Sequence, residues 1–286
     1  MHFRNCLIAI LFFTGTELYA ATGVPMPSIT FYGMLVDEFG WPYESNVRFD
    51  IQSLGKSIYS RSITPAQGVD YNFLVRVPYD SGTGTAAYSA NALLPGADIS
   101  VKVVALATGS VLINTNLVVS FQAGAVFIVN LTAGTDSLGD GIPDELRRWI
   151  WQNTGTGLFD PSTIRALGDA DFDGVSNLDE YHAGTDPANF DDVFRVEVSD
   201  SGVADVGKLT FYTVPGKTYK IHSSDLKPDS LWAPTNFANS PSSSATQTEF
   251  RGTGHYVSLF VPSNGVNTYF RVSVDWEGTS ITRNLP

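Results

Sequence analysis

Short runs in which hydrophobic and polar residues alternate dominate the first half of the chain. In residues 47–51, three hydrophobic side chains alternate with Arg48 and Asp50, which is the period of a half-buried β-strand. Similar apolar or alternating runs, separated by residues typical of turns, occupy 29–36, 71–77, 99–105, 111–119 and 125–131. Short strands at this spacing predict a β-sandwich of Ig-like type over residues 24–132.

The pattern changes in residues 136–192, where glycine and aspartate become frequent and short helical signals appear. Leu146, Trp149 and Ile150 fall at positions i, i+3 and i+4, which predicts one buried face of a helix. Two further short helices are expected, one carrying Ile164 and Leu167 and one carrying Leu178 and Tyr181. Their start and stop signals are Asp160-Pro161 for the first, and Gly184 and Pro187 after the second.

A β pattern returns in residues 193–286, for which we expect a second, fibronectin-like sandwich. Residues 209–213 and 219–222 flank Val214-Pro215-Gly216-Lys217, where proline and glycine specify a type II turn and so predict a hairpin. Residues 256–261 and 268–274 predict a second pair of strands. The expected fold is therefore mainly β, with two sandwich domains joined by a short helical segment.

The N-terminus has the features of an export signal. Arg4 precedes an apolar run from Cys6 to Phe13, and small residues follow at Ala20 and Ala21, which predicts a signal peptide over residues 1–21. The alternative is a buried first strand or helix. The run is too short to span a bilayer, so we expect a protein that is secreted or held at the cell surface, without a membrane span.

The cysteine content and the net charge limit which classes of protein this chain can belong to. Cys6 is the only cysteine, so an exported chain would be held together without disulfides. The formal net charge is −12, and thirteen acidic against three basic residues place −10 of it in residues 136–192. Such a field repels nucleic acid and attracts divalent cations, so no nucleic-acid partner is expected.

Twelve residues, 169–180, carry the clearest chemical signal. They read DADFDGVSNLDE and fit the calcium-loop template D-x-[DN]-x-[DN]-G-x5-E at every specified position. Calcium takes six to eight oxygen ligands, and Gly174 permits the sharp turn that the loop requires. The predicted ligands are the side chains or carbonyls of Asp169, Asp171, Asp173, Val175, Asn177 and Glu180. The alternative is an acidic turn without an ion, in which four carboxylates would repel one another.

Residues 136–147 match the same template only in part. Leu138 replaces the acid at position 3, and Arg147 replaces the closing glutamate at position 12. The candidate ligands of a second calcium ion are Asp136, Asp140, Ile142 and Asp144. Two alternatives remain: a turn scaffold that only starts the Trp149 helix, or a site shared with the other loop.

Residues 136–145 and 169–187 together resemble a thrombospondin type 3 repeat of the kind found in secreted bacterial proteins. The resemblance implies calcium binding by aspartate-rich loops in a segment that links domains. The flanks resemble other modules more loosely. Residues 31–40 are similar to the opening of carboxypeptidase-regulatory-like domains, and residues 214–219 and 269–272 with Trp232 are similar to fibronectin type III-like modules.

These features predict a secreted, calcium-binding structural or adhesion protein in which the ion stiffens the linker between two β domains. The expected partner is an extracellular polysaccharide or a cell-surface or matrix protein. A carbohydrate-binding accessory protein is the alternative, with Trp41 as the best candidate for an exposed aromatic ring; an extracellular hydrolase is less favoured. No enzyme is expected, because no histidine has zinc-ligand spacing and no Gly-x-Ser-x-Gly elbow occurs.

Overall fold

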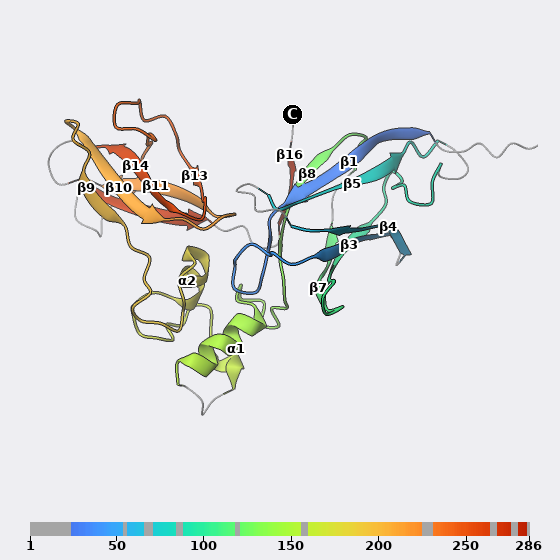
Figure 1. Ribbon diagram of the computed structural model, residues 1–286, viewed down its shortest axis with the longest axis horizontal. Coiled ribbons are helices and arrows are strands. Elements are labelled where there is room, and N and C mark those ends of the chain that lie inside the picture. The colour runs from blue at the N-terminus through green and yellow to red at the C-terminus, as the bar shows by residue number, and fades with distance from the viewer. Residues whose placement is uncertain are drawn as a thin grey trace, which may run out of the picture.

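The computed structural model describes residues 24–53, 56–65, 71–83, 88–117, 121–155, 160–224, 231–263, 268–275 and 280–284. The predicted signal peptide, residues 1–21, lies outside the described residues. As predicted, the chain is mainly β: the described part contains two α-helices and many short strands. Figure 1 shows two β-rich units with the helices α1 and α2 below and between them.

The first β-rich unit has two sheets that share one core. In the order of their pairing, the strands of one sheet are β16 (Ser280–Asn284), β8 (Val126–Thr132), β1 (Pro25–Gly33) and β5 (Phe73–Asp80), with β2 (Leu35–Val36) also paired to β8. Those of the other are β4 (Lys56–Ile63), β3 (Val47–Ser53), β6 (Ile99–Ala105) and β7 (Val111–Leu117). Both sheets contribute side chains to one buried cluster, so the predicted alternation marks the faces that meet.

The last strand of the chain belongs to the first unit. β16 pairs antiparallel with β8, from Ser280 opposite Asn130 to Asn284 opposite Val126. The sequence pattern instead predicts these residues in the C-terminal domain, because nothing local in them indicates a distant partner. The second β-rich unit is therefore connected to the first at both of its ends, by the helical segment before it and by β16 after it.

The second β-rich unit also has two sheets around one core. One contains β14 (Tyr256–Pro262), β10 (Val206–Tyr212) and β9 (Glu197–Asp200). The other contains β12 (Ala233–Pro234), β11 (Thr218–Ser224) and β13 (Phe250–Arg251), with β15 (Tyr269–Asp275) paired to β11.

The predicted hairpin of β10 and β11 is wrong, although its turn is present. Lys217 N–H donates to Val214 C=O at 3.3 Å, and Gly216 has a φ of 82°. The two strands nevertheless lie in different sheets, β10 beside β14 and β11 beside β15, so the predicted pairing of β14 with β15 is wrong too. The reason is burial: Phe211 and Tyr219 face each other across the core from opposite layers.

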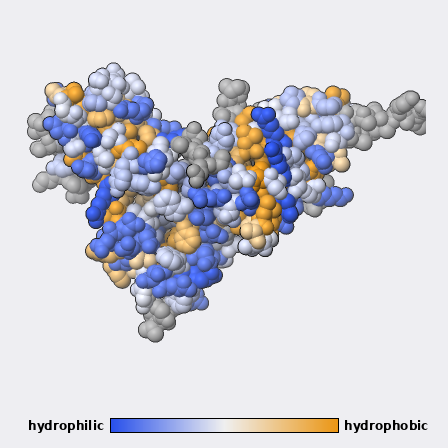
Figure 2. All heavy atoms as spheres, viewed as in Figure 1, coloured by the Kyte–Doolittle hydropathy of each residue, from blue (hydrophilic) through white to orange (hydrophobic). Residues whose placement is uncertain are grey.

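The middle segment contains α1 (Asp144–Asn153), the 3-10 turn η1 (Pro161–Thr163) and α2 (Asn177–Ala183). Two of the three predicted helices are confirmed as α1 and α2, and α2 ends at Gly184 in the left-handed conformation, with a φ of 85°. The third predicted helix is only one turn: Asp160 caps it, but Ile164 is extended and turns into a small core while Leu167 is exposed. Figure 2 shows mostly hydrophilic residues over this lower part of the molecule.

Tyr181 on α2 joins the middle segment to both β-rich units. A Cβ atom on Gly40, in the first unit, would lie 3.0 Å from the Tyr181 ring. Lys217, in the second unit, donates from Nζ to Tyr181 C=O at 2.8 Å and is almost fully buried. Burial lowers the pKa of Lys217 to about 7.

No helix in the described ranges is long and apolar enough to cross a membrane.

Candidate metal centre

Two loops of the middle segment repeat the same backbone structure; we call residues 136–147 loop 1 and residues 169–180 loop 2. In each, the first aspartate accepts two backbone N–H groups, three and five residues further on. Asp136 accepts from Gly139 at 2.9 Å and from Gly141 at 2.8 Å. Asp169 accepts from Phe172 at 2.7 Å and from Gly174 at 2.9 Å. These hydrogen bonds hold the backbone of each loop in its turn conformation, and none of them involves an ion.

The backbone angles of the two loops agree as well. Gly141 and Gly174, at position 6, both have a φ of 97°, which favours glycine. At position 4, Gly139 has a φ of 66° and Phe172 a φ of 67°. Phe172 adopts a left-handed conformation that is uncommon for a bulky side chain, so loop 2 holds the same shape at a conformational cost.

In loop 2 the carboxylates converge. Oxygen atoms of Asp169, Asp171 and Asp173 all lie within 4.8 Å of one another. Glu180, in the first turn of α2, is 1% exposed. One buried oxygen on each of three of these residues, Asp171 Oδ2, Asp173 Oδ2 and Glu180 Oε2, has no hydrogen-bond partner among the described residues. Such oxygens are costly to bury as anions unless a proton or a cation compensates them.

The pKa values of two acidic residues in loop 2 reflect this cost. Burial, followed by repulsion from Asp171, Asp173 and Asp169, raises the pKa of Glu180 to about 8. Burial and the neighbouring aspartates also raise the pKa of Asp171. Without a cation, loop 2 therefore favours a protonated glutamate near neutral pH.

The remaining two predicted ligands of loop 2 have different surroundings. Val175 follows Gly174 and donates its N–H to Asp173 Oδ1 at 2.7 Å, which places it inside the turn. Asn177 is buried and bound to backbone at both ends of its amide: Oδ1 accepts from Ala170 N–H at 3.1 Å, and Nδ2 donates to Arg165 C=O at 2.8 Å. Its amide holds the two ends of the loop together, which argues against the predicted role of Asn177 as a ligand of the ion.

The centre of loop 1 is occupied by the side chain of Arg147. Its guanidinium is 3% exposed and donates from Nη2 to Asp140 Oδ1 at 2.6 Å and to Ile142 C=O at 3.0 Å. Asp136 Oδ1 lies 3.7 Å from the same nitrogen. Positions 1, 5 and 7 of the loop thus surround a cation that belongs to the chain itself.

This arrangement argues against the predicted second calcium site. Asp136, Asp140 and Ile142 direct oxygens at the Arg147 guanidinium, which supplies the positive charge that an ion would otherwise bring. Asp144 points elsewhere, because it accepts from Thr135 Oγ1 at 2.9 Å and from Ser137 N–H at 3.0 Å. Burial alone would raise the pKa of Asp140, but hydrogen bonds from Arg147 and Ala166 lower it below its ordinary value.

The two loops also contact each other. Ala166 N–H donates to Asp140 Oδ2 at 3.2 Å, and Arg147 Nη1 donates to Ile164 C=O, so the residues leading into loop 2 bind to the centre of loop 1. A Cβ atom on Gly141 would lie 3.1 Å from the side chain of Leu178 on α2. Loop 1 is therefore hydrogen-bonded to the residues that precede loop 2 and packed against α2.

The donor set of loop 2 is all oxygen and mostly carboxylate, which suits a hard divalent cation and not a metal that prefers sulfur or imidazole. The sequence template found this site. In loop 1 the template marks Arg147 only as a lost ligand. Its position, equivalent to Glu180, is the signal that its side chain returns to the loop centre. Comparison of the chain with protein-family models, with curated proteins and with solved structures gives no match.

Proposed function

We propose that loop 2 binds one calcium ion through Asp169, Asp171, Asp173, the carbonyl of Val175 and Glu180. This proposal rests on three buried carboxylate oxygens that have no donor among the described residues, on a loop that fits the calcium template throughout. A bidentate glutamate at position 12 is the ligand that closes such sites, and Glu180 is buried beside the three aspartates.

The ion has an architectural role in this proposal. Glu180 and Tyr181 are neighbours on α2, and Tyr181 contacts both the Gly40 turn of the first unit and Lys217 of the second. Fixing Glu180 on the ion therefore fixes the helix that joins the two units. The chain would act as an exported structural or adhesion protein, and its partner would be an extracellular polysaccharide or a cell-surface or matrix protein.

Thermal unfolding with calcium and with EGTA tests the proposal. An ion at a hundred times its dissociation constant stabilises the folded state by about 2.7 kcal/mol, so the wild-type protein should unfold several degrees higher in calcium. Glu180→Gln keeps the shape of the side chain, removes the charge, and should abolish most of the shift. Asp98→Asn, which changes the net charge equally at an exposed position of the first unit, should leave it intact. A wild-type protein whose unfolding ignores calcium contradicts the proposal.

A further inference from the structure

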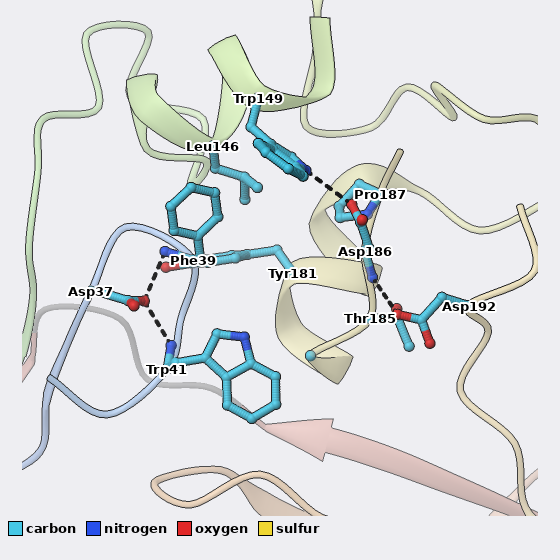
Figure 3. A pocket seen from close by; sticks show the side chains of 11 residues that line it. Asp37, Phe39, Trp41, Leu146, Trp149, Tyr181, Thr185, Asp186, Pro187 and Asp192 are labelled. Carbon is cyan, nitrogen blue, oxygen red and sulfur yellow. Dashed lines mark hydrogen bonds between the residues drawn. The ribbon is translucent and has the colours of Figure 1, made fainter. Parts of the chain in front are cut away.

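A cavity of about 380 Å³ lies where three parts of the chain meet. Its walls come from the turn after β2, from α1, and from the residues that follow α2. The lining residues are Asp37, Phe39, Trp41, Leu146, Trp149, Tyr181, Gly184, Thr185, Asp186, Pro187 and Asp192. This volume is within the range of small-ligand sites, and Figure 3 shows the side chains around one common space.

Aromatic rings form two sides of the cavity. Figure 3 shows Trp149 above and Trp41 below, with Phe39 on the left. The rings of Phe39 and Trp149 meet edge to face, with centroids 6.2 Å apart, so each braces the other. Phe39, Trp41 and Trp149 are all exposed, by 36%, 39% and 42%, although large aromatic side chains usually bury most of their surface. The wall is preformed and open to solvent.

Figure 3 shows two carboxylates on the right side of the cavity and a third on the left. On the right, Asp186 Oδ1 accepts from Trp149 Nε1–H at 3.2 Å, and Asp192 Oδ2 accepts from Asp186 N–H at 3.0 Å. On the left, beside Phe39, Asp37 Oδ1 accepts from the N–H groups of Phe39 and Trp41. Among the described residues that line the cavity, none is lysine, arginine or histidine. The cavity therefore combines π faces with three acidic groups and no compensating base.

We infer that this cavity binds a cationic group on an aliphatic stem, the side chain of a lysine or arginine presented by a partner polypeptide. A cation over an aromatic face is attracted by the ring quadrupole, and the carboxylates add charge complementarity and accept its N–H groups. The aliphatic stem would lie against Leu146 and the rings, as long basic side chains do on apolar surface.

The donor and acceptor balance favours a cation over a neutral sugar. Sugar hydroxyls both donate and accept, whereas this wall offers mainly acceptors. Two of its side-chain donors are already used: Trp149 Nε1–H on Asp186, and Thr185 Oγ1–H at 3.5 Å from Glu180 oxygens. Lys217 Nζ donates to Tyr181 C=O at 2.8 Å, and Lys217 is not among the residues that line the cavity.

Titration of the full-length protein, followed by NMR, tests the inference through the indole N–H signals of Trp41 and Trp149. The probe is a blocked Gly-Lys-Gly peptide, and its matched control is the same peptide with the lysine Nε acetylated, which removes the charge and keeps the stem. Calcium is present at saturation, so that carboxylates of loop 2 do not compete for the amine. Cellobiose serves as the neutral-sugar arm.

We expect the lysine peptide to shift both indole signals saturably, and the acetylated peptide to bind about tenfold more weakly. Asp192→Asn keeps an acceptor for Asp186 N–H and should weaken the lysine peptide, whereas Asp98→Asn should not. Trp41→Ala should weaken it as well. Equal binding of the two peptides, equal losses for the two aspartate variants, or saturable binding of cellobiose in place of the lysine peptide would each overturn the inference.

Discussion

Loops 1 and 2 have the same backbone and opposite centres. Each begins with an aspartate that accepts N–H groups three and five residues on, and each has a glycine with a φ of 97° at position 6. Position 12 decides the difference: Arg147 brings a guanidinium into loop 1, and Glu180 brings a fourth carboxylate into loop 2. The negative charge on the same backbone scaffold can thus be neutralised by a basic side chain of the protein, or it can require a cation from solution.

Both departures of loop 1 from the calcium template lower its negative charge. Leu138 removes an anion at position 3, and Arg147 replaces a second anion with a cation. Two carboxylates then face one buried guanidinium, Asp140 at 2.6 Å and Asp136 at 3.7 Å. Loop 1 is compensated internally, whereas loop 2 keeps an excess of negative charge that only protons or metal can neutralise.

Breaking loop 1 should have the largest effect. Arg147→Met removes the charge and the donors but keeps much of the stem, leaving Asp140 and the carbonyls of Ile142 and Ile164 without their partner. Removing one member of a fully buried pair typically costs about 3–5 kcal/mol. Because Asp140 is 26% exposed, the free energy of unfolding in urea should fall by less than that, but by more than about 1 kcal/mol. Arg148→Met is the control, because Arg148 pairs with Glu145 at the exposed surface and should cost less than about 1 kcal/mol. Similar losses for the two variants would refute the special role of Arg147.

Converting loop 1 into loop 2 sharpens the comparison. Leu138→Asp together with Arg147→Glu restores carboxylates at positions 3 and 12, and the glycines of the turn are already present. The double variant should bind one more calcium ion per chain than the wild-type protein, measured by calorimetric titration. It should also become less stable than the wild type in EGTA, because its own cation is gone. A stoichiometry unchanged by the double variant would show that position 12 does not decide what the loop binds.

The pH dependence of loop 2 should show a smaller effect of known sign. The pKa of Glu180 is raised from 4.5 to about 8 in the folded protein, so the protonated form stabilises the calcium-free fold below pH 4.5. That contribution is lost as the pH rises through about 8. In EGTA, the free energy of unfolding should therefore decline over this window, and Glu180→Gln should flatten the decline.

Calcium binding at pH 7 should release protons for the same reason, since the ion replaces the proton on Glu180. Calorimetry in two buffers of different ionisation enthalpy measures the number released. An enthalpy of binding that does not depend on the buffer would show that Glu180 is already ionised or does not bind the ion. The stability that Asp140 contributes should depend on pH in the opposite direction. Its pKa is lowered in the folded protein, so this stability is present above the ordinary pKa of aspartate and is lost only as the pH falls below it.

Local chemistry could be predicted from the sequence, and long-range pairing could not. The sharp turn at Gly174, the type II turn at Pro215-Gly216 and the left-handed cap at Gly184 all depend on neighbouring residues, and all three turns appear in the structure. The calcium ion itself stays a prediction. The pairing of β10 with β14 and the return of β16 to β8 depend on which faces are buried against each other far along the chain. The turn reverses the direction of the chain, but it does not determine which sheet each flanking strand joins.

The candidate cavity shows the same limit. The sequence predicts Trp41 as an exposed ring from its place in a turn, but it does not indicate the neighbours of that ring. Trp149 falls on a predicted helix, and Asp186 falls between the stop signals Gly184 and Pro187. Only the folded arrangement brings these residues to one cavity, from three parts of the chain that have no pattern in common.

The number of calcium ions bound by the wild-type chain tests the comparison most directly. Loop 1 already contains its cation and loop 2 does not, so calorimetric titration of the metal-free protein should give one ion per chain, and none with Glu180→Gln. Two ions would show that Arg147 does not close loop 1, and no ion would show that loop 2 is an acidic turn without a metal.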